Sequence, residues 1–343
     1  MTYESLFPFC CGGPAGRPSL RDGGTGCDRS GGDAPQAEET VTVHLNLIGD
    51  FDVAVDQDPL TRSESSDDVY AINVIYDDGQ YAYGLFDNVA DMVITLLSNH
   101  RYTFECSLIK NAKNTIFYGQ AFNNAYSGYA YPFQTSASNS TLVNNRFILG
   151  TGVKFTGLQS SNTHMASTSS PSTSNYSKYA PGVNRFYGRT ANYNPVPNGT
   201  IDIYLKRVVF GTKFVISGLQ EGYLTIKAGD IFTSTYLSDG VIERIYTCPD
   251  VYNAWNQDLP LVYTVELTYT SDRGEGSGTL WNLSQSRDIQ FRRNVMTTVN
   301  IQLAPDLSGI RVNLTEEEMD PDNDIHLGIN TDGLIDIIVT PND

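Results

Sequence analysis

Short runs of alternating apolar and polar residues recur along this chain from residue 41 onward, and they constrain its fold more than any other feature. In the first run, Val41, Val43, Leu45 and Leu47 share one parity, which continues to Val55. Successive side chains of an extended strand point to opposite faces, so this pattern predicts a half-buried strand over 41–55. Similar alternation, or a short apolar run bounded by turn residues, predicts strands at 69–76, 102–109, 201–205, 208–216, 223–226, 241–246, 261–269, 295–303, 310–314 and 334–339.

Many short strands, with no amphipathic pattern of 12 or more residues, predict an all-β chain. The stretch 89–97 fits either a short helix or a buried strand. A length of 343 residues leaves room for two domains, at about 100–200 residues each. We therefore expect two antiparallel β-sandwich domains in tandem over 41–207 and 208–343, preceded by an unfolded leader or tether over 1–40.

The charge and cysteine content narrow the classes of function. A formal net charge of −17 argues against binding to nucleic acid or to a bare anionic membrane, because both need concentrated Lys and Arg. The five cysteines include no CxxC pair, and the four histidines are scattered, which argues against zinc. Cys106 lies in a predicted strand and reads as a buried thiol, while a disulfide with Cys248 stays open.

The first 40 residues resemble the start of a bacterial lipoprotein in one respect. Gly24-Thr25-Gly26-Cys27 is similar to the end of a lipobox, in which the cysteine becomes lipidated, and a polar tether follows it. The basic start and apolar stretch of an export signal are not found before it. Either the true start site lies upstream or the match is a coincidence. We predict lipidation at Cys27.

The region 120–200 differs from the rest of the chain in being dense in Tyr, Ser, Asn, Thr and Gly. Such a composition predicts exposed, irregular loops on a scaffold. Aromatic faces stack on sugar rings or protein partners, so Tyr126, Tyr129 and Tyr131 are candidate ligand-binding residues. The alternative is that these loops only cover the ends of a sandwich.

No catalytic arrangement of residues emerges, and we predict no enzyme activity, no cofactor and no metal. The chain has no GxSxG motif, and the glycine-rich stretch 272–278 lacks the lysine of a phosphate-binding loop. Asp320, Asp322 and Asp324 have the spacing of calcium ligands. Ile325 replaces the loop glycine and Thr331 the closing glutamate, so a solvated acidic loop is the favoured interpretation over calcium.

Three segments stand out, which are RYTFECSLIKNA at 101–112, IYLKRVVF at 203–210 and IQFRRNVMTTVNIQL at 289–303. They resemble the fimbrillin families of Bacteroidota, which supply the shaft, anchor and tip subunits of surface pili and related lipoproteins. Residues 101–112 (RYTFECSLIKNA) are similar to a strand of the family's first domain. Residues 203–210 (IYLKRVVF) are similar to the strand that leads into the second domain. Residues 289–303 (IQFRRNVMTTVNIQL) resemble a strand pair late in that domain. The resemblance spans residues 41–315 through the order and spacing of these segments.

The resemblance implies two transthyretin-like β-sandwiches exported as a lipoprotein. In polymerising members a trypsin-like or Arg-specific protease removes the first strand, and a strand of a neighbouring subunit fills the groove. Here the strand over 41–55 would leave. Arg62 is the only Lys or Arg between Arg29 and Arg101, so it is the candidate cleavage point. Its plainer interpretation is a solvated loop arginine, and anchor-type and tip-type members can keep their first strand.

The leading hypothesis is a structural or accessory fimbrial subunit in surface adhesion, held at the outer membrane or within the fimbrium. Its expected partners are other fimbrial subunits, joined by β-strand addition, and a host glycan or protein receptor. We expect no nucleic acid partner, and contact with the membrane only through a lipid anchor. The alternative is a glycan-binding surface lipoprotein that never polymerises.

Overall fold

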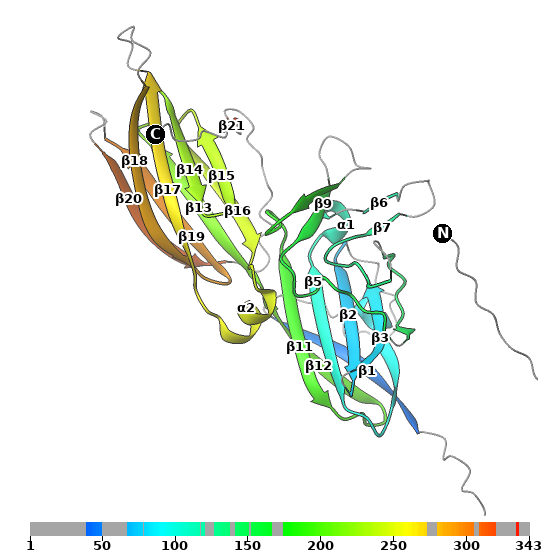
Figure 1. Ribbon diagram of the computed structural model, residues 1–343. Helices are drawn as coiled ribbons and strands as arrows, with labels where there is room; N and C mark the ends of the chain where they lie inside the picture. The colour runs from blue at the N-terminus through cyan, green and yellow to red at the C-terminus, as the bar shows by residue number, and fades with distance from the viewer. Residues whose placement is uncertain are drawn as a thin grey trace, which may run out of the picture. The chain divides into compact units, whose positions relative to one another are not determined.

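The computed structural model describes residues 39–49, 67–77, 79–116, 118–120, 127–137, 141–150, 152–166, 174–272, 280–304, 309–319 and 334–335. In these ranges the chain is nearly all β, which confirms the predicted class (Figure 1). All the described residues belong to one compact unit. Almost all strand pairs are antiparallel, and the exceptions bring together strands that are far apart in the sequence.

The first half of the chain contributes an eight-stranded sheet. The first described strand lies in its interior, between a strand from the middle of this half and the strand that ends it. In spatial order the sheet consists of β4 (Val93–Leu97), β1 (Thr40–Gly49), β12 (Gly199–Arg207), β11 (Arg185–Tyr193), β5 (Tyr102–Ile109), β2 (Val69–Tyr76), β3 (Gly79–Phe86) and β8 (Ile148–Leu149).

This sheet curls around one hydrophobic core. The core contains side chains from β1, β4 and β12 at one end of the sheet and from β5, β2 and β3 in the rest of it. Because side chains alternate along a strand, every second residue points into this core. In β2, Tyr70, Ile72 and Val74 face this core, while Val69 and Ala71 face a second core on the other side of the sheet. Strands β2 and β5 are therefore covered on both faces.

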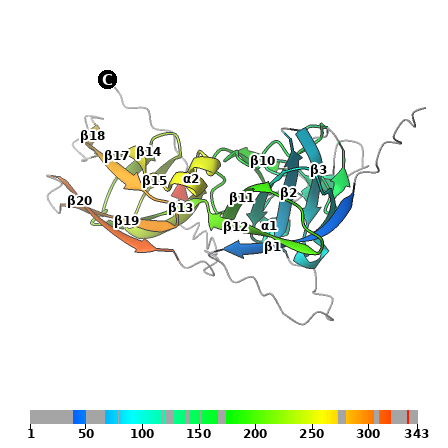
Figure 2. The same ribbon diagram turned by 90° about the horizontal axis from the view of Figure 1, so that it is seen from below.

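The second half forms two further sheets that pack face to face, as Figure 2 shows from below. Apolar side chains from both sheets fill the space between them, among them Phe214, Val299, Leu224 and Leu267. One sheet consists of β16 (Gly240–Thr247), β13 (Val209–Ser217), β19 (Val295–Leu303) and β20 (Ile310–Glu318). The other consists of β18 (Leu280–Phe291), β17 (Leu261–Asp272), β14 (Tyr223–Ala228), β15 (Phe232–Tyr236) and β21 (Leu334–Ile335). The chain passes from the eight-stranded sheet to this half at Val208.

Short elements complete the described fold. Two small strand pairs are β6 (Tyr118–Gln120) with β7 (Ser127–Tyr129) and β9 (Thr163–Ala166) with β10 (Ser174–Ser177). The helical pieces are the 3-10 turn η1 (Val89–Asp91) and two α-helices, α1 (Ala112–Thr115) and α2 (Val251–Gln257). In the ranges given above, no helix is long and apolar enough to cross a membrane. The ambiguous stretch 89–97 thus holds both η1 and β4.

The prediction that 120–200 is exposed coil is wrong in part. Strand β11 lies within it, at an interior position of the eight-stranded sheet. Tyr129, Phe133 and Tyr179 are buried in the core, with exposed fractions of at most 4%. The error has a physical cause, because a tyrosine ring is large enough to fill a core while its hydroxyl bonds to a polar neighbour. Tyrosine-rich composition alone does not distinguish the two uses.

Cys106 and Cys248 are both buried and unpaired, so the disulfide left open by the sequence does not form and the buried-thiol interpretation is confirmed. Burial raises the pKa of the Cys106 thiol, and it raises that of Cys248 to about 12. Both thiols therefore stay protonated and unreactive at neutral pH. Cys10, Cys11 and Cys27 lie outside the described residues.

Candidate functional site

Strand β1 is the candidate site, because it fills a gap between two strands that do not pair with each other. It runs parallel to β12, from Val43 opposite Gly199 to Gly49 opposite Leu205. On its other side it runs antiparallel to β4, from Thr40 opposite Leu97 to His44 opposite Val93. In Figure 1 it is the blue strand beside β12. We call the space that β1 occupies between β12 and β4 the slot.

Four side chains anchor β1 in the slot. Val41, Val43, Leu45 and Leu47 are at most 6% exposed and belong to the core of the eight-stranded sheet, while Thr42 and His44 between them face solvent. Burying each such side chain stabilises the docked strand by about 1.5–3 kcal/mol, before the cost of ordering the backbone. The strand is therefore held mainly by four apolar contacts at every second residue.

Hydrogen bonds hold both edges of β1. Next to β4, the Leu45 N–H donates to the Met92 carbonyl at 3.0 Å, and the Ser98 N–H donates to the Glu39 carbonyl at 2.8 Å. Next to β12, the Asn46 amide donates to the Asp202 carboxylate at 2.8 Å. Removal of β1 would leave unpaired backbone groups on both neighbours together with exposed core. Another strand with the same apolar spacing would pair with these backbone groups and cover the exposed core.

The predicted site residues are only partly described. Cys27, Arg62 and Tyr126 lie outside the described residues, as does the acidic stretch from Asp320 to Asp324. Tyr129 is buried, and its ring packs edge-on against Phe133 at 6.0 Å between centroids. Tyr131 is half-buried, and its ring contacts His164 at 6.2 Å. Within the described ranges, Tyr129 and Tyr131 do not form a shared exposed surface.

Sequence reasoning missed a buried arginine, Arg185, on β11. Its guanidinium donates to the carbonyls of Gly157 (3.1 Å), Leu158 (2.7 Å) and Ser160, and its Nε donates to the Ser107 hydroxyl at 3.1 Å. Burial lowers the pKa of Arg185 to about 9, so the side chain remains charged at neutral pH. One charged side chain thus ties the segment 157–160 to the face of the sheet.

A buried carboxylate lies on the same face of the sheet. Glu105 accepts hydrogen bonds from the Tyr187 hydroxyl (2.7 Å), the Gln159 amide (2.6 Å) and the Asn73 amide (3.1 Å). Burial is the main cause that raises the pKa of Tyr187, and the neighbouring Glu105 raises it further, so the phenol keeps its proton. Because three donors satisfy the carboxylate, we interpret this cluster as a structural support for the loop at Gln159.

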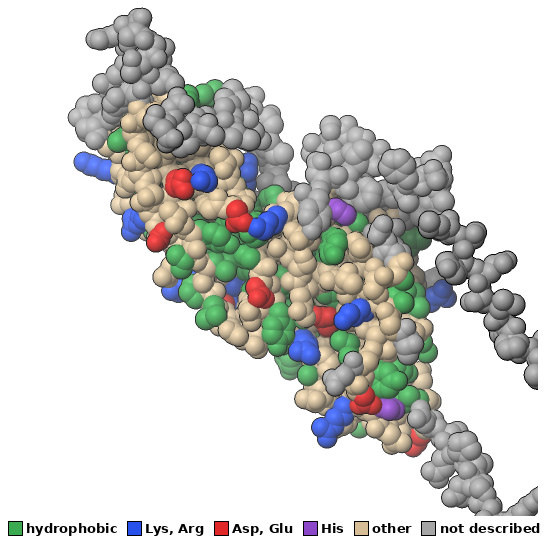
Figure 3. Space-filling model, viewed as in Figure 1, with side chains coloured by type: hydrophobic (Ala, Val, Ile, Leu, Met, Phe, Trp, Pro, Cys, Tyr) green, Lys and Arg blue, Asp and Glu red, His purple; other side chains and the backbone are tan. Residues whose placement is uncertain are grey.

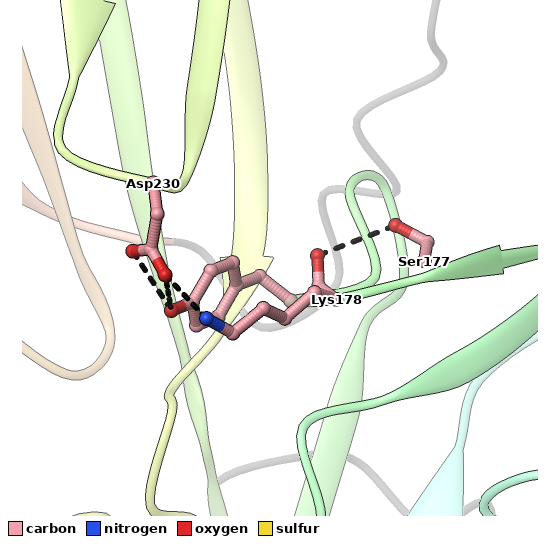
Figure 4. A network of polar contacts seen from close by, with 4 residues as sticks. Ser177, Lys178 and Asp230 are labelled. Atoms are coloured by element: carbon pink, nitrogen blue, oxygen red, sulfur yellow. Dashed lines mark hydrogen bonds and ion pairs between the residues drawn. The ribbon is translucent and has the colours of Figure 1, made fainter.

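A second polar cluster joins the segment before β11 to the turn between β14 and β15 (Figure 4). The Tyr179 hydroxyl donates to both carboxylate oxygens of Asp230 at 3.0 Å, and the Lys178 ammonium also bonds to Asp230. The ammonium lies 4.9 Å from the centre of the Tyr179 ring. These bonds, first that of Lys178 and then that of Tyr179, lower the pKa of the Asp230 carboxyl below its usual range.

The lowered pKa of Asp230 predicts a pH-dependent contribution to stability. The contribution is present above the ordinary aspartate pKa of about 4, and it is lost as pH falls through the lower folded value. We expect Asp230→Ala to lower the urea midpoint of unfolding at pH 7 and to differ much less from wild type at pH 3. Lys178→Gln should follow the same pH trend. A difference from wild type that is equal at both pH values would contradict this explanation.

In the described part of the surface shown in Figure 3, acidic and basic side chains are spread out, several of them as neighbouring pairs of opposite charge. Among the described residues of that face, Lys and Arg form no concentrated basic stripe of the kind that binds a phosphate backbone. The large apolar side chains that are most exposed in the described ranges are Leu149, Tyr204, Val241, Leu259, Val262 and Val196.

Fold and site together define a large all-β protein whose first strand completes a sheet from its interior. No protein-family model matches the chain, and no curated protein sequence matches it either. Similar solved structures include a protein proposed to bind polysaccharide from Bacteroides thetaiotaomicron, at 9% identity and a TM-score of 0.36, covering 81% of this chain and 98% of that one. The tip fimbrial protein Mfa3 from Porphyromonas gingivalis is similar at 10% identity and 0.33, with coverage of 82% and 100%.

The fimbrial anchor protein Mfa2 from the same organism is similar at 10% identity and a TM-score of 0.31, with coverage of 81% and 98%. Two of these three structures are thus fimbrial proteins, and the third is described as binding polysaccharide. Because the TM-scores lie below 0.5, these similarities carry no argument about the function of this chain.

Proposed function

We propose that this chain is a structural or accessory subunit of a surface fimbrium that acts in adhesion and assembles by donor-strand exchange, in which a strand of a neighbouring subunit replaces its first strand after a cut in the chain. The position of β1 carries the proposal. It is the first described strand, it lies inside a sheet, and its two neighbours do not pair with each other. Its removal would create a slot of the kind that accepts an extended peptide by β-strand addition.

The slot sets chemical requirements on an incoming strand. It takes a strand with four apolar side chains at every second position, because Val41, Val43, Leu45 and Leu47 fill the core from one face. The residues between them face solvent and can be polar. A replacement with the direction of β1 lies parallel to β12 and antiparallel to β4. A strand of a neighbouring subunit that meets these requirements and stays attached to its own chain would link the two subunits.

Release of β1 requires a break in the chain between β1 and β2, which begins at Val69. Arg62 is the only basic residue between Arg29 and Arg101, and it lies in this connection. A protease specific for arginine would therefore separate β1 from the rest of the sheet with one cut there. After the cut, β1 is held only by its noncovalent contacts, and mass action by a competing strand can replace it.

We expect a chain cut after Arg62 to exchange β1. The full chain is treated with an Arg-specific protease, and uptake of a fluorescent peptide of residues 40–49 is followed by anisotropy. The cut chain should bind the peptide and form heat-stable multimers, while the uncut chain should do neither. A peptide with Val43→Asp should bind at least about 100-fold more weakly, because a charge would enter the core.

The variant Arg62→Lys provides the matched control. It keeps the charge, resists the Arg-specific enzyme and is cut by a Lys-specific one, so uptake should follow the cut and not the substitution. A cut chain that retains β1 for days and excludes the peptide would overturn strand exchange. That result would favour a surface lipoprotein that never polymerises and binds glycan through the tyrosine-rich region.

We further propose that the chain is tethered to the cell surface through a lipid on Cys27. The support is the Thr25-Gly26-Cys27 sequence followed by a polar stretch that leads to β1. Mass spectrometry of the mature N-terminus tests this proposal: a diacyl or triacyl group on Cys27 supports it, and an unmodified Cys27 overturns it. A mature start at Ser63 would instead place the cut after Arg62.

A further inference from the structure

Strand β4 lies at the edge of the eight-stranded sheet, and β1 is the strand beside it in the described part of the chain. The backbone groups of alternate residues in a strand point to the same side. On the side of β4 that faces β1, the Met92 carbonyl accepts from the Leu45 N–H, and the Ser98 N–H donates to the carbonyl of Glu39, just before β1. The backbone N–H and carbonyl groups of Thr95 and Leu97, which have the opposite parity, therefore point away from β1.

Two tyrosine hydroxyls occupy this outer side of β4. The Tyr81 hydroxyl donates to the Thr95 carbonyl at 2.8 Å. The Leu97 N–H donates to the Tyr102 hydroxyl oxygen at 2.9 Å, and that hydroxyl lies 3.3 Å from the Leu97 carbonyl, to which it donates. Side chains of β3 and β5 thus take the place that a further strand would have beside β4.

A β-bulge places Tyr81 in this position. In the β2–β3 pair, Val74 is opposite Ala82 and Ile75 is opposite Gln80, so Tyr81 is an extra residue without a partner on β2. The bulge reverses the alternation of β3. Tyr81 consequently packs against the core that the eight-stranded sheet curls around, to which β1 belongs, whereas Tyr83 packs against the second core on the other face of the sheet. Bulges commonly redirect a side chain in this way.

The two tyrosines are held rigidly and stay protonated. Their rings pack edge-on at 5.3 Å, and both pack with Tyr76, at 5.4 Å from Tyr81 and 6.0 Å from Tyr102. Tyr102 is fully buried. Burial raises the pKa of both phenols, that of Tyr102 to about 12, so each hydroxyl retains the proton that it donates to β4.

We propose that Tyr81 and Tyr102 are positioning residues that hold β4 as a fixed wall of the slot while β1 is absent, and so set how tightly the slot takes an incoming strand. This inference rests on the proposed strand exchange. Once β1 leaves, β4 has lost its strand partner. What then holds it are the two hydroxyls, its connections to β3 and β5, and the buried side chains of Met92, Ile94 and Leu96.

This role differs from an ordinary contribution to stability. In the intact chain, β1 and the tyrosines hold β4 from both sides, so loss of one hydroxyl has a limited effect on the strand. In the cut chain, the same loss frees one side of the slot, and the incoming strand must order β4 as it binds. Ordering a mobile segment on binding weakens affinity. The effect of the substitution should therefore be larger without β1 than with it.

The test uses Tyr81→Phe, Tyr102→Phe and the double variant in the full chain, each cut after Arg62 and freed of β1 by dilution from mild denaturant. The affinity for the peptide of residues 40–49 should fall about tenfold for each lost hydroxyl. Amide hydrogen exchange over 92–98 should speed up at least tenfold in the cut variants, while exchange in β2 and β5 stays near that of the cut wild type.

Tyr83→Phe is the control, because Tyr83 lies two residues further along β3 and packs against Phe155 on the other face. It should bind the peptide like wild type. The inference is overturned if the double variant binds as tightly as wild type and exchanges β4 amides at the same rate. If wild type takes up no peptide, the proposed function fails. Exchange at the Leu97 amide of the intact chain then decides the tyrosine role: a rate unchanged in Tyr102→Phe would overturn it.

Discussion

Replacing Val43 with aspartate is expected to destabilise the docked state of β1 by more than about 4 kcal/mol. Val43 is fully buried in the core of the slot. The substitution removes an apolar side chain worth about 1.5–3 kcal/mol and buries a carboxylate without a partner, which costs still more. Because domains are typically stable by about 5–15 kcal/mol, such a loss is a large part of the total.

Hydrogen exchange of residues 40–49 and urea unfolding measure this effect together. If the remaining strands fold without β1, the amides of β1 lose protection in Val43→Asp while those of β2 and β5 keep theirs. After a cut at Arg62 and removal of β1, the Val43→Asp chain should then bind the wild-type peptide as the cut wild type does. The control is Thr42→Asp, one residue earlier and exposed, which should change stability by less than about 1 kcal/mol. Equal losses in the two variants would show that the alternation of β1 does not determine its docking.

Replacing Arg185 with methionine is the second change with a large expected effect, a loss of about 3 kcal/mol or more in the free energy of unfolding. Methionine keeps most of the volume, but the carbonyls of Leu158 and Ser160 lose the buried donor that they bond to. Each orphaned buried acceptor costs about 1–3 kcal/mol. Urea unfolding gives the magnitude, and limited proteolysis at 150–166 shows whether this segment loosens first.

Arg189→Met is the matched control for this prediction. Arg189 lies four residues further along β11, is only half-buried, and lies 5.8 Å from the centre of the Tyr252 ring. An arginine over an aromatic ring at such a site contributes about 0.5–1 kcal/mol. If Arg185→Met were no more destabilising than Arg189→Met, the buried hydrogen bonds of Arg185 would not be what holds the segment 157–160.

The regular strands could be predicted from the sequence because their pattern is local. The predictions at 69–76, 102–109 and 295–303 match β2, β5 and β19 at both ends. Strand β11 was missed because arginine, glycine and asparagine interrupt its apolar pattern. Its buried Arg185 is stable only because loop carbonyls come to it from residues 157–160, and no local pattern contains that information.

The candidate site illustrates the same limit. The resemblance to fimbrillins implies that the first strand is the one to leave, but nothing in the sequence identifies β12 and β4 as its neighbours, since strand pairing depends on contacts between distant segments. The role of Tyr81 depends on a one-residue bulge that reverses the face of the side chain. The residues Cys27 and Arg62 remain predictions, because they lie outside the described part of the chain.

The parallel pairing of β1 with β12 has a consequence for the order of folding. Asn46 and Asp202, which bond across this pair, are 156 residues apart in the chain. During synthesis from the N-terminus, β1 therefore emerges before its neighbour β4 and long before its other neighbour β12, so the slot is complete only when nearly the whole sheet has been made. Contacts of such long range form late, because the entropy of closing the loop must be overcome first. If β1 docks last for this reason, the other strands fold without it, which is the state that strand exchange requires.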